Sequence, residues 1–323
     1  MRLHVVALGL RTRFRGITRR EVALVETEGP DGSSRWGEWS PFLEYDAPTA
    51  APWLTCAEEA AAGGWPAAVR DAVPVNVTVP ATDPETAHRI VRSGGCTTAK
   101  VKVAERGQTL ADDVARLEAV RDALGPAGHV RVDANGGWSL DEAVRAVGVL
   151  DRAVGGLEYV EQPCASVEEL AALRRRVDVP VAADESIRRA ADPYRVRDLE
   201  AADIAVLKVQ PLGGVAACLR IAEDIGLPVV VSSALESSVG IAAGVALAAA
   251  LPELPHACGL ATVQLFTEDV VADPLLPVDG MLPVRSVVPD PGLLERHAAA
   301  PDRLAWWADR LAAVGAVRQD RRS

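Results

Sequence analysis

Residues 204–208, IAVLK, and residues 229–233, VVVSS, are short aliphatic runs that end in polar residues and precede a helical stretch. The same unit recurs through the middle of the chain, with strand starts 22 to 31 residues apart. Helical spacing of apolar residues is evident in residues 110–124 and 167–177. Eight such units predict an α/β fold whose parallel strands close into a barrel. The predicted strands are residues 75–79, 99–103, 130–134, 157–161, 179–183, 204–208, 229–233 and 256–261.

The two ends of the chain have different patterns. Residues 3–10 and 21–27 alternate apolar and polar side chains, and the turn GPDG at residues 29–32 leads into residues 35–39. This pattern predicts an antiparallel meander. After residue 262 we expect a proline-rich segment and one last helix that returns to the N-terminal sheet. An open doubly wound sheet is the alternative, but it predicts a glycine-rich phosphate loop, and neither GxGxxG nor GxxxxGK[ST] occurs.

Composition limits the class of protein. The 45 acidic and 34 basic residues give a formal charge of −11, which argues against a nucleic-acid partner. The five cysteines are far apart and form no CxxC, so a reducing compartment is expected. The N-terminus does not resemble a signal peptide, and the longest apolar stretch, residues 239–251, is too short to span a bilayer. We therefore expect a cytoplasmic protein without a membrane partner, and a monomer.

Three carboxylates stand at the ends of successive predicted strands: Asp133, Glu161 and Asp184. The carboxyl ends of barrel strands meet at one face, so these groups would converge and repel each other unless a cation lies between them. An all-oxygen ligand set with no paired His or Cys favours a hard ion, and the prediction is Mg²⁺, with Mn²⁺ as a substitute. Each acid alone would be read as a helix cap or a surface salt bridge, but three in succession favour a metal site.

Lysines end the predicted strands on either side of these acids. Lys100 and Lys102 share one strand face, and Lys208 ends a strand on the opposite wall. A lysine can remove a proton only when it is neutral, and burial beside a metal ion and a second ammonium lowers its pKa. The lone His129 and His256 are interpreted as structural. A base across from a second cation suits removal of a proton α to a carboxylate.

At this point the sequence resembles the enolase superfamily, and within it the muconate-lactonizing-enzyme-like subgroup. The resemblance covers essentially the whole chain and implies a (β/α)8-type (modified TIM) barrel with an α+β capping domain. The implied division is residues 1–70 and 263–323 for the capping domain and residues 71–262 for the barrel. The motifs that carry it are TAKVK at 98–102, RVDAN at 131–135, EQP at 161–163, DES at 184–186, LKV at 207–209 and, in the cap, WGE at 36–38.

Within this subgroup, residues 203–214 and 232–240 are most similar to the o-succinylbenzoate synthase family. The resemblance implies a lyase of menaquinone synthesis that dehydrates a small hydroxycyclohexadiene carboxylate through an enediolate. It implies catalytic roles for Lys102, as base and then acid, and for Lys208, as a stabilising cation. The implied metal ligands are Asp133, Glu161 and Asp184; the supporting residues are Lys100, Arg131, Asn135 and Glu185; the substrate contacts are Ser232, Ser233, Gly259 and Leu260, with Phe14, Arg15 and Gly16 as further candidates.

Other functions of the subgroup remain open from sequence. An N-succinylamino acid racemase needs the same two lysines, one for each face of the α-carbon. A dipeptide epimerase usually carries an acidic pair at the eighth strand, and residues 256–262 contain no acid. A muconate cycloisomerase would usually have a larger cap. A non-enzymatic scaffold is the remaining alternative, although it would have no need of three lysines around a metal site.

Overall fold

The chain begins with an antiparallel sheet, as the alternating pattern predicted. The computed structural model describes residues 1–14, 16–189 and 192–320. In the N-terminal sheet, Val25 of the middle strand pairs with Leu3 on one side and Gly37 on the other. The predicted turn at residues 29–32 is present, with Gly32 at a φ of 78° that favours glycine. The strands are β1 (Arg2–Phe14), β2 (Ile17–Glu28) and β3 (Ser34–Trp39), and α1 (Ala47–Ala62) packs on them.

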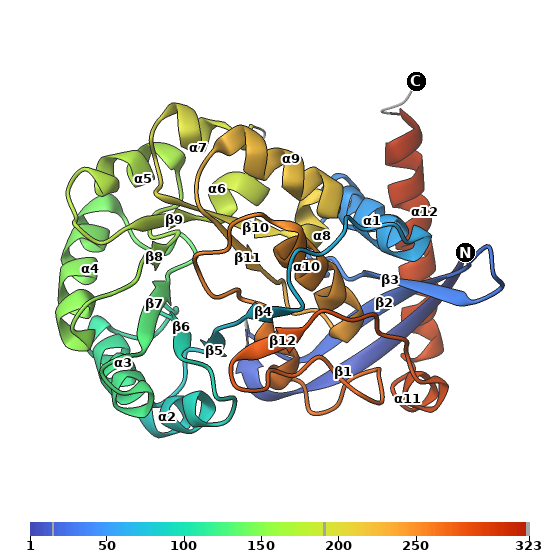
Figure 1. Cartoon of the computed structure of the whole chain (residues 1–323), viewed down its shortest axis with the longest axis horizontal. Coiled ribbons are helices and arrows are strands. Elements are labelled where there is room, and N and C mark those ends of the chain that lie inside the picture. The colour runs from blue at the N-terminus through green and yellow to red at the C-terminus, as the bar shows by residue number, and fades with distance from the viewer. Residues whose placement is uncertain (15, 190–191, 321–323) are drawn as a thin grey trace.

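The middle of the chain forms a curled parallel sheet with helices along its outer side (Figure 1). In the described part of the chain seven strands lie in the sheet in the same order as in the sequence. This excludes the doubly wound alternative, because the strand order of a doubly wound sheet reverses at its middle. The strands are β5 (Val77–Val79), β6 (Thr98–Lys102), β7 (His129–Asp133), β8 (Val160–Glu161), β9 (Val181–Ala183), β10 (Ile204–Lys208) and β11 (Val229–Ser232).

The predicted strand over residues 256–261 was wrong as a continuous element. The segment makes single bridges instead, from Cys258 to Val75 and from Gly259 to Ser232. Its last predicted residue already belongs to a 3₁₀ turn, η1 (Ala261–Leu265). The predicted first strand, residues 75–79, is shorter than expected: β5 covers its last three residues, and Val75 makes only a single bridge. Just before it, the short strand β4 (Ala72–Pro74) pairs with β12 (Met281–Pro283) outside the parallel sheet. The segment at Cys258 and Gly259 thus contacts residues beside both edges of the parallel sheet.

The helices bury their apolar faces against the outer side of the parallel sheet. Helix α3 begins and ends where the sequence predicted, because Thr109 and Asp112 form a capping box and Gly125 follows its last turn. The helix predicted over residues 167–177 ends earlier, at Arg174. The helices are α2 (Pro84–Arg92), α3 (Leu110–Leu124), α4 (Leu140–Val154), α5 (Val167–Arg174), α6 (Glu185–Arg188), α7 (Arg195–Asp198), α8 (Val209–Leu212), α9 (Val215–Ile225) and α10 (Ser238–Ala250).

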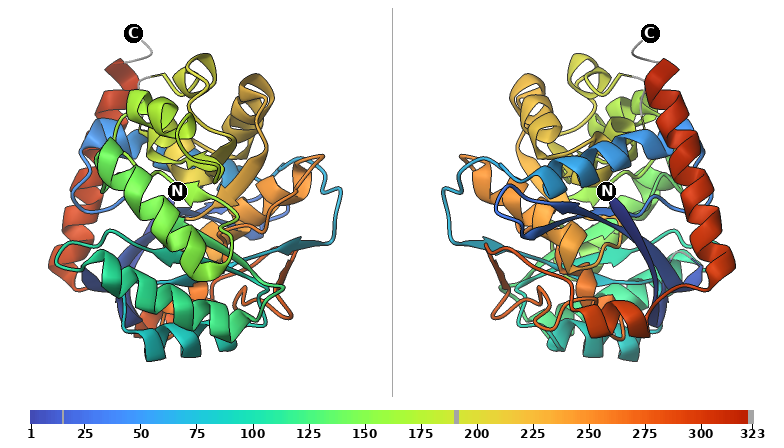
Figure 2. Two further views of the ribbon diagram at one scale, coloured as in Figure 1. Left: turned by 90° about the vertical axis from the view of Figure 1, so that its left-hand side faces the viewer. Right: turned by 90° about the vertical axis from the view of Figure 1, so that its right-hand side faces the viewer.

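The C-terminal segment lies against the N-terminal sheet, and the last helix runs along that side of the molecule (Figure 2). Backbone bonds join Ala7 to His297 and Ala299 to Val5. One last helix was predicted, but the described chain contains two, α11 (Pro291–Arg296) and α12 (Pro301–Asp320), each starting at a proline that suits the first helical turn. None of the helices in the described ranges is long and apolar enough to cross a membrane.

Candidate active site

The carboxyl ends of the parallel strands bring the predicted acids and lysines together. The strand register pairs Lys102 with Asp133 and Asp133 with Glu161. Side chains two residues apart on a strand share a face, so Lys100 lies one step below Lys102 on the same inner side. Asp184 follows β9, and Lys208 ends β10. Sequential pairing therefore brings these charged side chains together in one cluster at the carboxyl ends of the strands.

Each of the three acids is fully buried and paired with a cation. Lys102 Nζ lies 2.5 Å from Asp133 Oδ2. Lys100 Nζ donates to both oxygens of Glu161, at 2.8 and 2.9 Å, and lies 3.4 Å from Asp133 Oδ2. Lys208 Nζ lies 2.6 Å from Asp184 Oδ2. The cluster thus consists of three buried carboxylates, each paired with a lysine, and Lys100 bridges two of them.

The chemistry of this donor set fits a hard divalent cation. Among the residues that the structure describes, no three such side chains are grouped closely enough to hold a metal as they stand. Each acid is instead turned toward a cation, as expected of buried carboxylates without another positive charge. Burial and then the charge of Asp133 raise the pKa of Glu161 to about 7, so the acids repel one another. A Mg²⁺ or Mn²⁺ ion bound by the three carboxylates would relieve this repulsion.

The two lysines of β6 have opposite electrostatic environments. Burial opposes the charge of Lys100, but Glu161 and Asp133 outweigh it and raise its pKa. For Lys102, burial is the dominant cause and lowers the pKa, and the neighbouring Lys100 ammonium lowers it further. Asp133 counteracts this shift in part. Lys102 is therefore the member of the pair that more readily becomes a neutral amine.

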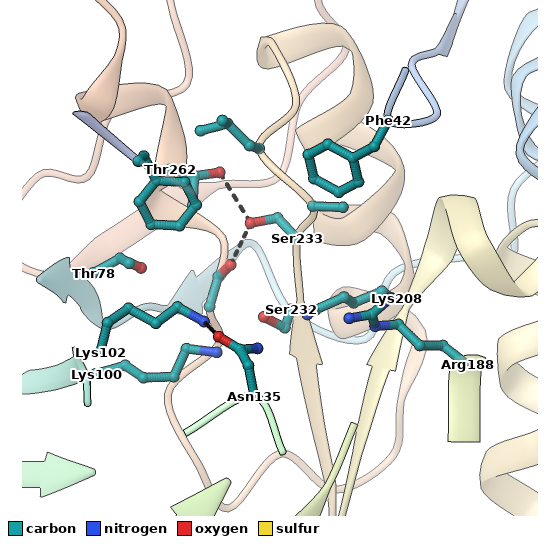
Figure 3. A pocket seen from close by; sticks show the side chains of 14 residues that line it. Phe42, Thr78, Lys100, Lys102, Asn135, Arg188, Lys208, Ser232, Ser233 and Thr262 are labelled. Carbon is teal, nitrogen blue, oxygen red and sulfur yellow. Dashed lines mark hydrogen bonds between the residues drawn. The ribbon is translucent and has the colours of Figure 1, made fainter. Parts of the chain in front are cut away.

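A pocket opens above this cluster, and Lys100 and Lys102 enter it from one side while Lys208 enters from the other (Figure 3). Ser233 Oγ donates to the Gly259 carbonyl at 2.7 Å and lies 2.9 Å from Thr262 Oγ1. The pocket is lined by Phe14, Phe42, Thr78, Lys100, Lys102, Asn135, Arg188, Lys208, Ser232, Ser233, Ala234, Leu235, Gly259 and Thr262.

Some of the expected substrate contacts line this pocket and others do not. Ser232, Ser233 and Gly259 are among its lining residues, whereas Leu260 is buried away from it beside Gly244. Of the candidates in the first hairpin, Phe14 lines the pocket and Gly16 does not, and Arg15 lies outside the described residues.

Two supporting residues hold the lysine side of the site. Asn135 Oδ1 accepts from Lys102 Nζ at 2.7 Å, and its amide nitrogen donates to Glu185 Oε1 at 3.2 Å. The φ of Asn135 is 47°, a left-handed conformation that asparagine tolerates better than most residues. Asn135 therefore fixes the position of the Lys102 amine and joins it to Glu185.

Arg131 lies one layer below the three acids. Its Nε lies 2.8 Å from Glu158 Oε2, and it donates to the Tyr159 hydroxyl at 3.0 Å and the Ala257 carbonyl at 2.6 Å. Glu158 also contacts His256 Nδ1 at 2.8 Å, which gives this histidine a structural partner. Arg131 thus links β7 to the segment after β11 rather than contacting the pocket.

Two polar residues of the site were missed by sequence reasoning. Arg188 of α6 donates to Asp184 Oδ1 at 2.7 Å and pairs with Glu185. Gln162 accepts from the backbone nitrogens of Asp184 and Ser186, at 3.0 and 3.1 Å. Only the EQP motif could have drawn attention to Gln162, and the four-residue helix that carries Arg188 has too few residues to show a period.

Comparisons with known proteins agree with this geometry. An enolase C-terminal domain-like family model matches residues 83–294, and an enolase N-terminal domain-like model matches residues 5–61. The chain is 66% identical to an o-succinylbenzoate synthase of Thermobifida fusca over 96% of this chain and 95% of the relative. An o-succinylbenzoate synthase of Mycolicibacterium smegmatis is 61% identical over 98% and 96% of the two chains.

A solved structure has the same fold at low identity. The muconate lactonizing enzyme from Pseudomonas fluorescens superimposes with a TM-score of 0.80 and 22% identity, covering 92% of this chain and 98% of that one. The matched family models and the near-complete, high-identity alignments agree with the lysine and carboxylate motifs of the strand ends. The chain belongs to the enolase superfamily and, within it, to the o-succinylbenzoate synthase family.

Proposed function

We propose that the chain is an o-succinylbenzoate synthase, a lyase that dehydrates 2-succinyl-6-hydroxy-2,4-cyclohexadiene-1-carboxylate to 2-succinylbenzoate in menaquinone biosynthesis. The observation that carries this proposal is the pocket with Lys102 on one side, Lys208 on the other and three buried carboxylates below. The relatives named as synthases are 58 to 66% identical to the chain. Elimination of water needs a base and an acid on the substrate, and one lysine can act as each in turn.

The carboxylates of Asp133, Glu161 and Asp184 are the residues that would hold Mg²⁺. The bound ion would supply positive charge beside the substrate carboxylate and so lower the pKa of the adjacent C–H. Mn²⁺ is the expected substitute, because it accepts the same oxygen ligands.

The proton transfers are assigned to Lys102. Its neutral amine takes the ring proton next to the carboxylate, and the charge that develops on the carboxylate oxygens is stabilised by the positive charge of Lys208. Lys102, now an ammonium, gives the proton to the departing hydroxyl on the same face. One C–H and one C–O bond break, water leaves and the ring becomes aromatic. Asn135 Oδ1, 2.7 Å from Lys102 Nζ, keeps the amine aimed into the pocket.

We assign the domains in the same way as the sequence suggested. Residues 71–262 are proposed to form a closed (β/α)8 barrel, supported by the bridges of Cys258 and Gly259 to residues beside both sheet edges. Residues 1–70 and 263–323 are proposed to form the capping domain, supported by the backbone bonds of Ala7 and Val5 to the C-terminal segment.

The test is direct detection of product. Purified protein with Mg²⁺ and the cyclohexadiene substrate should yield 2-succinylbenzoate by mass spectrometry, and Lys208→Ala should reduce the rate by a factor of about a hundred or more. N-succinylamino acids in D₂O form the second arm. Incorporation of α-deuterium without dehydration of the cyclohexadiene would overturn the synthase and favour a racemase, which the opposed lysines also suit.

A further inference from the structure

Glu38 is a carboxylate of the N-terminal sheet whose side chain is buried against the parallel-sheet part of the molecule. It lies in β3 opposite Leu24, and only 2% of it is exposed. A buried carboxylate is costly unless donors surround it, so its partners reveal what it holds in place. These partners come from the segments that follow β3, β10 and β11.

One oxygen of Glu38 caps helix α10. Glu38 Oε2 accepts from the backbone nitrogens of Ser237 at 3.0 Å and Gly240 at 3.1 Å, and from Ser237 Oγ at 2.5 Å. The first N–H groups of a helix have no partner within it, and a negative charge is favourable there. A side chain from the N-terminal sheet therefore completes the start of a helix that follows β11.

The other oxygen reaches the segment after Lys208. Glu38 Oε1 accepts from Ser40 Oγ at 2.6 Å and from Gln210 Nε2 at 3.4 Å. Gln210 Oε1 accepts in turn from the backbone nitrogen of Ser40 at 3.1 Å. Gln210 stands two residues beyond Lys208, so Glu38 joins the ends of β10 and β11 to one point of the N-terminal sheet.

Arg20 extends this network to the pocket wall. Its Nε donates to the Leu235 carbonyl at 3.3 Å, and its Nη2 donates to the Ser40 carbonyl. The guanidinium lies 4.3 Å from the centre of the Phe42 ring. Leu235 and Phe42 both line the pocket, and Figure 3 shows Phe42 on the same side as Ser233. Arg20 therefore connects the network around Glu38 to two residues that line the pocket.

Close packing around Gly240 leaves this network little room to shift. A Cβ at that position would come within 2.6 Å of the Glu236 side chain and 2.9 Å of Gln210 Nε2. A glycine here lets α10 approach the buried polar groups closely. The pocket wall is thus supported by a network that is both hydrogen-bonded and sterically confined.

We propose that Glu38 is a positioning residue that holds the pocket wall of Phe42, Ala234 and Leu235 in the arrangement that binds substrate. This inference deepens the proposed function and rests on it for its kinetic readout. Because these three side chains line the pocket and are apolar, they cannot transfer protons, and loss of Glu38 should weaken substrate binding more than it slows the chemistry.

The chain offers a matched control in Glu59 of α1. Its two oxygens accept from the backbone nitrogens of Val215 at 2.5 Å and Ala216 at 3.0 Å, at the start of α9. Glu59 thus also caps a helix that follows a strand of the parallel sheet, here β10. Neither Glu59 nor its partners line the pocket. A purely structural role for such caps would make Glu38→Gln and Glu59→Gln behave alike.

The experiment compares both variants of the full-length protein by steady-state kinetics and by amide hydrogen exchange. Glu38→Gln should raise KM for the cyclohexadiene substrate about tenfold while kcat changes by less than about threefold. Glu59→Gln should leave both constants near the wild-type values. Amide exchange should increase over residues 233–240 in Glu38→Gln and over residues 214–217 in Glu59→Gln.

Equal KM values for wild type and Glu38→Gln, or unchanged exchange over residues 233–240, would overturn the proposal. If Glu38→Gln does not fold, Ser237→Ala removes one partner hydroxyl of Glu38 and should give a smaller rise in KM; an unchanged KM there would also overturn it. An inactive wild type would contradict the proposed function instead. In that case the exchange data still decide whether Glu38 orders the wall, because they need no substrate.

Discussion

Lys100 and Lys102 show how neighbouring residues of one type acquire different roles. Lys100 is held between two carboxylates, Glu161 and Asp133, which favour its charged form. Lys102 has one carboxylate partner and the neutral Asn135 amide, and burial favours its neutral form. This difference supports the proposal that Lys102 is the base and Lys100 a fixed cation.

Asn135→Gly tests how the base is oriented. Glycine adopts the positive φ of this position without strain, so the variant removes the side-chain hydrogen bonds to Lys102 and Glu185 without disturbing the backbone. We expect kcat to fall about 10- to 100-fold, the range typical of lost supporting contacts. Steady-state kinetics check this, and a kcat within twofold of wild type would mean that Asn135 does not orient Lys102.

Residue chemistry was the most predictable level of this site. Asp133, Glu161, Asp184 and the lysines stand out because charged residues interrupt apolar strands. Arg188 and Gln162 could not be found in this way, because they lie in irregular segments and their partners are set by tertiary contacts. The WGE motif drew attention to Glu38, but its contacts with Ser237 and Gln210 span about 200 and 170 residues of sequence.

At the scale of the elements, Glu158 below the site forms ion pairs that join three segments of the parallel-sheet part of the molecule. Glu158 contacts Arg131 of β7 and His256 of the segment after α10. Burial opposes its charge, but the His256 and Arg131 contacts prevail and lower its pKa to about 2 from 4.5. A depressed carboxyl pKa stabilises the fold above the unfolded-state value and loses that contribution as pH falls toward the folded-state value.

Glu158→Gln should therefore destabilise the protein at neutral pH and flatten its acid response. We expect the free energy of unfolding at pH 7 to fall by about 1 to 3 kcal/mol, since bonds to a charged group are lost. Wild type should lose stability between about pH 5 and pH 2, and the variant should lose less over that range. Urea unfolding across pH checks this; parallel curves would contradict the assignment of this shift to Glu158.

Gly37 sets the contact between β3 and α1. A Cβ at this position would lie 1.9 Å from the Ala57 carbonyl oxygen, so Gly37→Ala should force the two elements apart. We expect a loss of about 1 to 3 kcal/mol. Gly315 in α12 is the control: a Cβ there meets nothing within 4 Å, and Gly315→Ala should stabilise by about 0.5 to 1 kcal/mol. Equal effects in thermal unfolding would contradict the packing argument.

Elements were predictable where the local pattern determines them. Helix α3 matched its predicted bounds because a capping box starts it and a glycine follows it. The strands at β6, β7 and β10 matched within a residue or so, since β-branched runs pair along their length. Residues 256–261 failed because their pairing consists of single bridges to distant residues, which no local periodicity encodes.

For the molecule as a whole, the C-terminal helix is tied to the N-terminal sheet through Glu21. Arg303 Nε and Trp307 Nε1 donate to Glu21 at 2.8 and 2.7 Å, and the Trp307 ring packs edge-on against Trp39. Trp307 is fully buried. The two ends of the chain therefore form one packed unit, an association that the sequence suggested only as a return of the tail.

Trp307→Ala should cost about 3 to 5 kcal/mol of stability, because it leaves a cavity and removes a partner of Glu21. Trp306, which is half-buried beside it, provides the control, and Trp306→Ala should cost clearly less. Neither residue lines the pocket, so kcat of the folded fraction should be unchanged. Calorimetry with kinetics checks this, and equal losses in the two variants would contradict the anchoring role.

The central claim is that Lys102, beside a carboxylate site for Mg²⁺, dehydrates the cyclohexadiene substrate. The most direct measurement is the loss of that substrate's absorbance with purified wild type and Mg²⁺, beside Lys102→Ala and an EDTA-treated sample. We predict rapid loss in wild type, a fall of at least about a hundredfold in Lys102→Ala, and loss of activity with EDTA that added Mg²⁺ restores. Wild-type rates in Lys102→Ala or in EDTA would contradict the account.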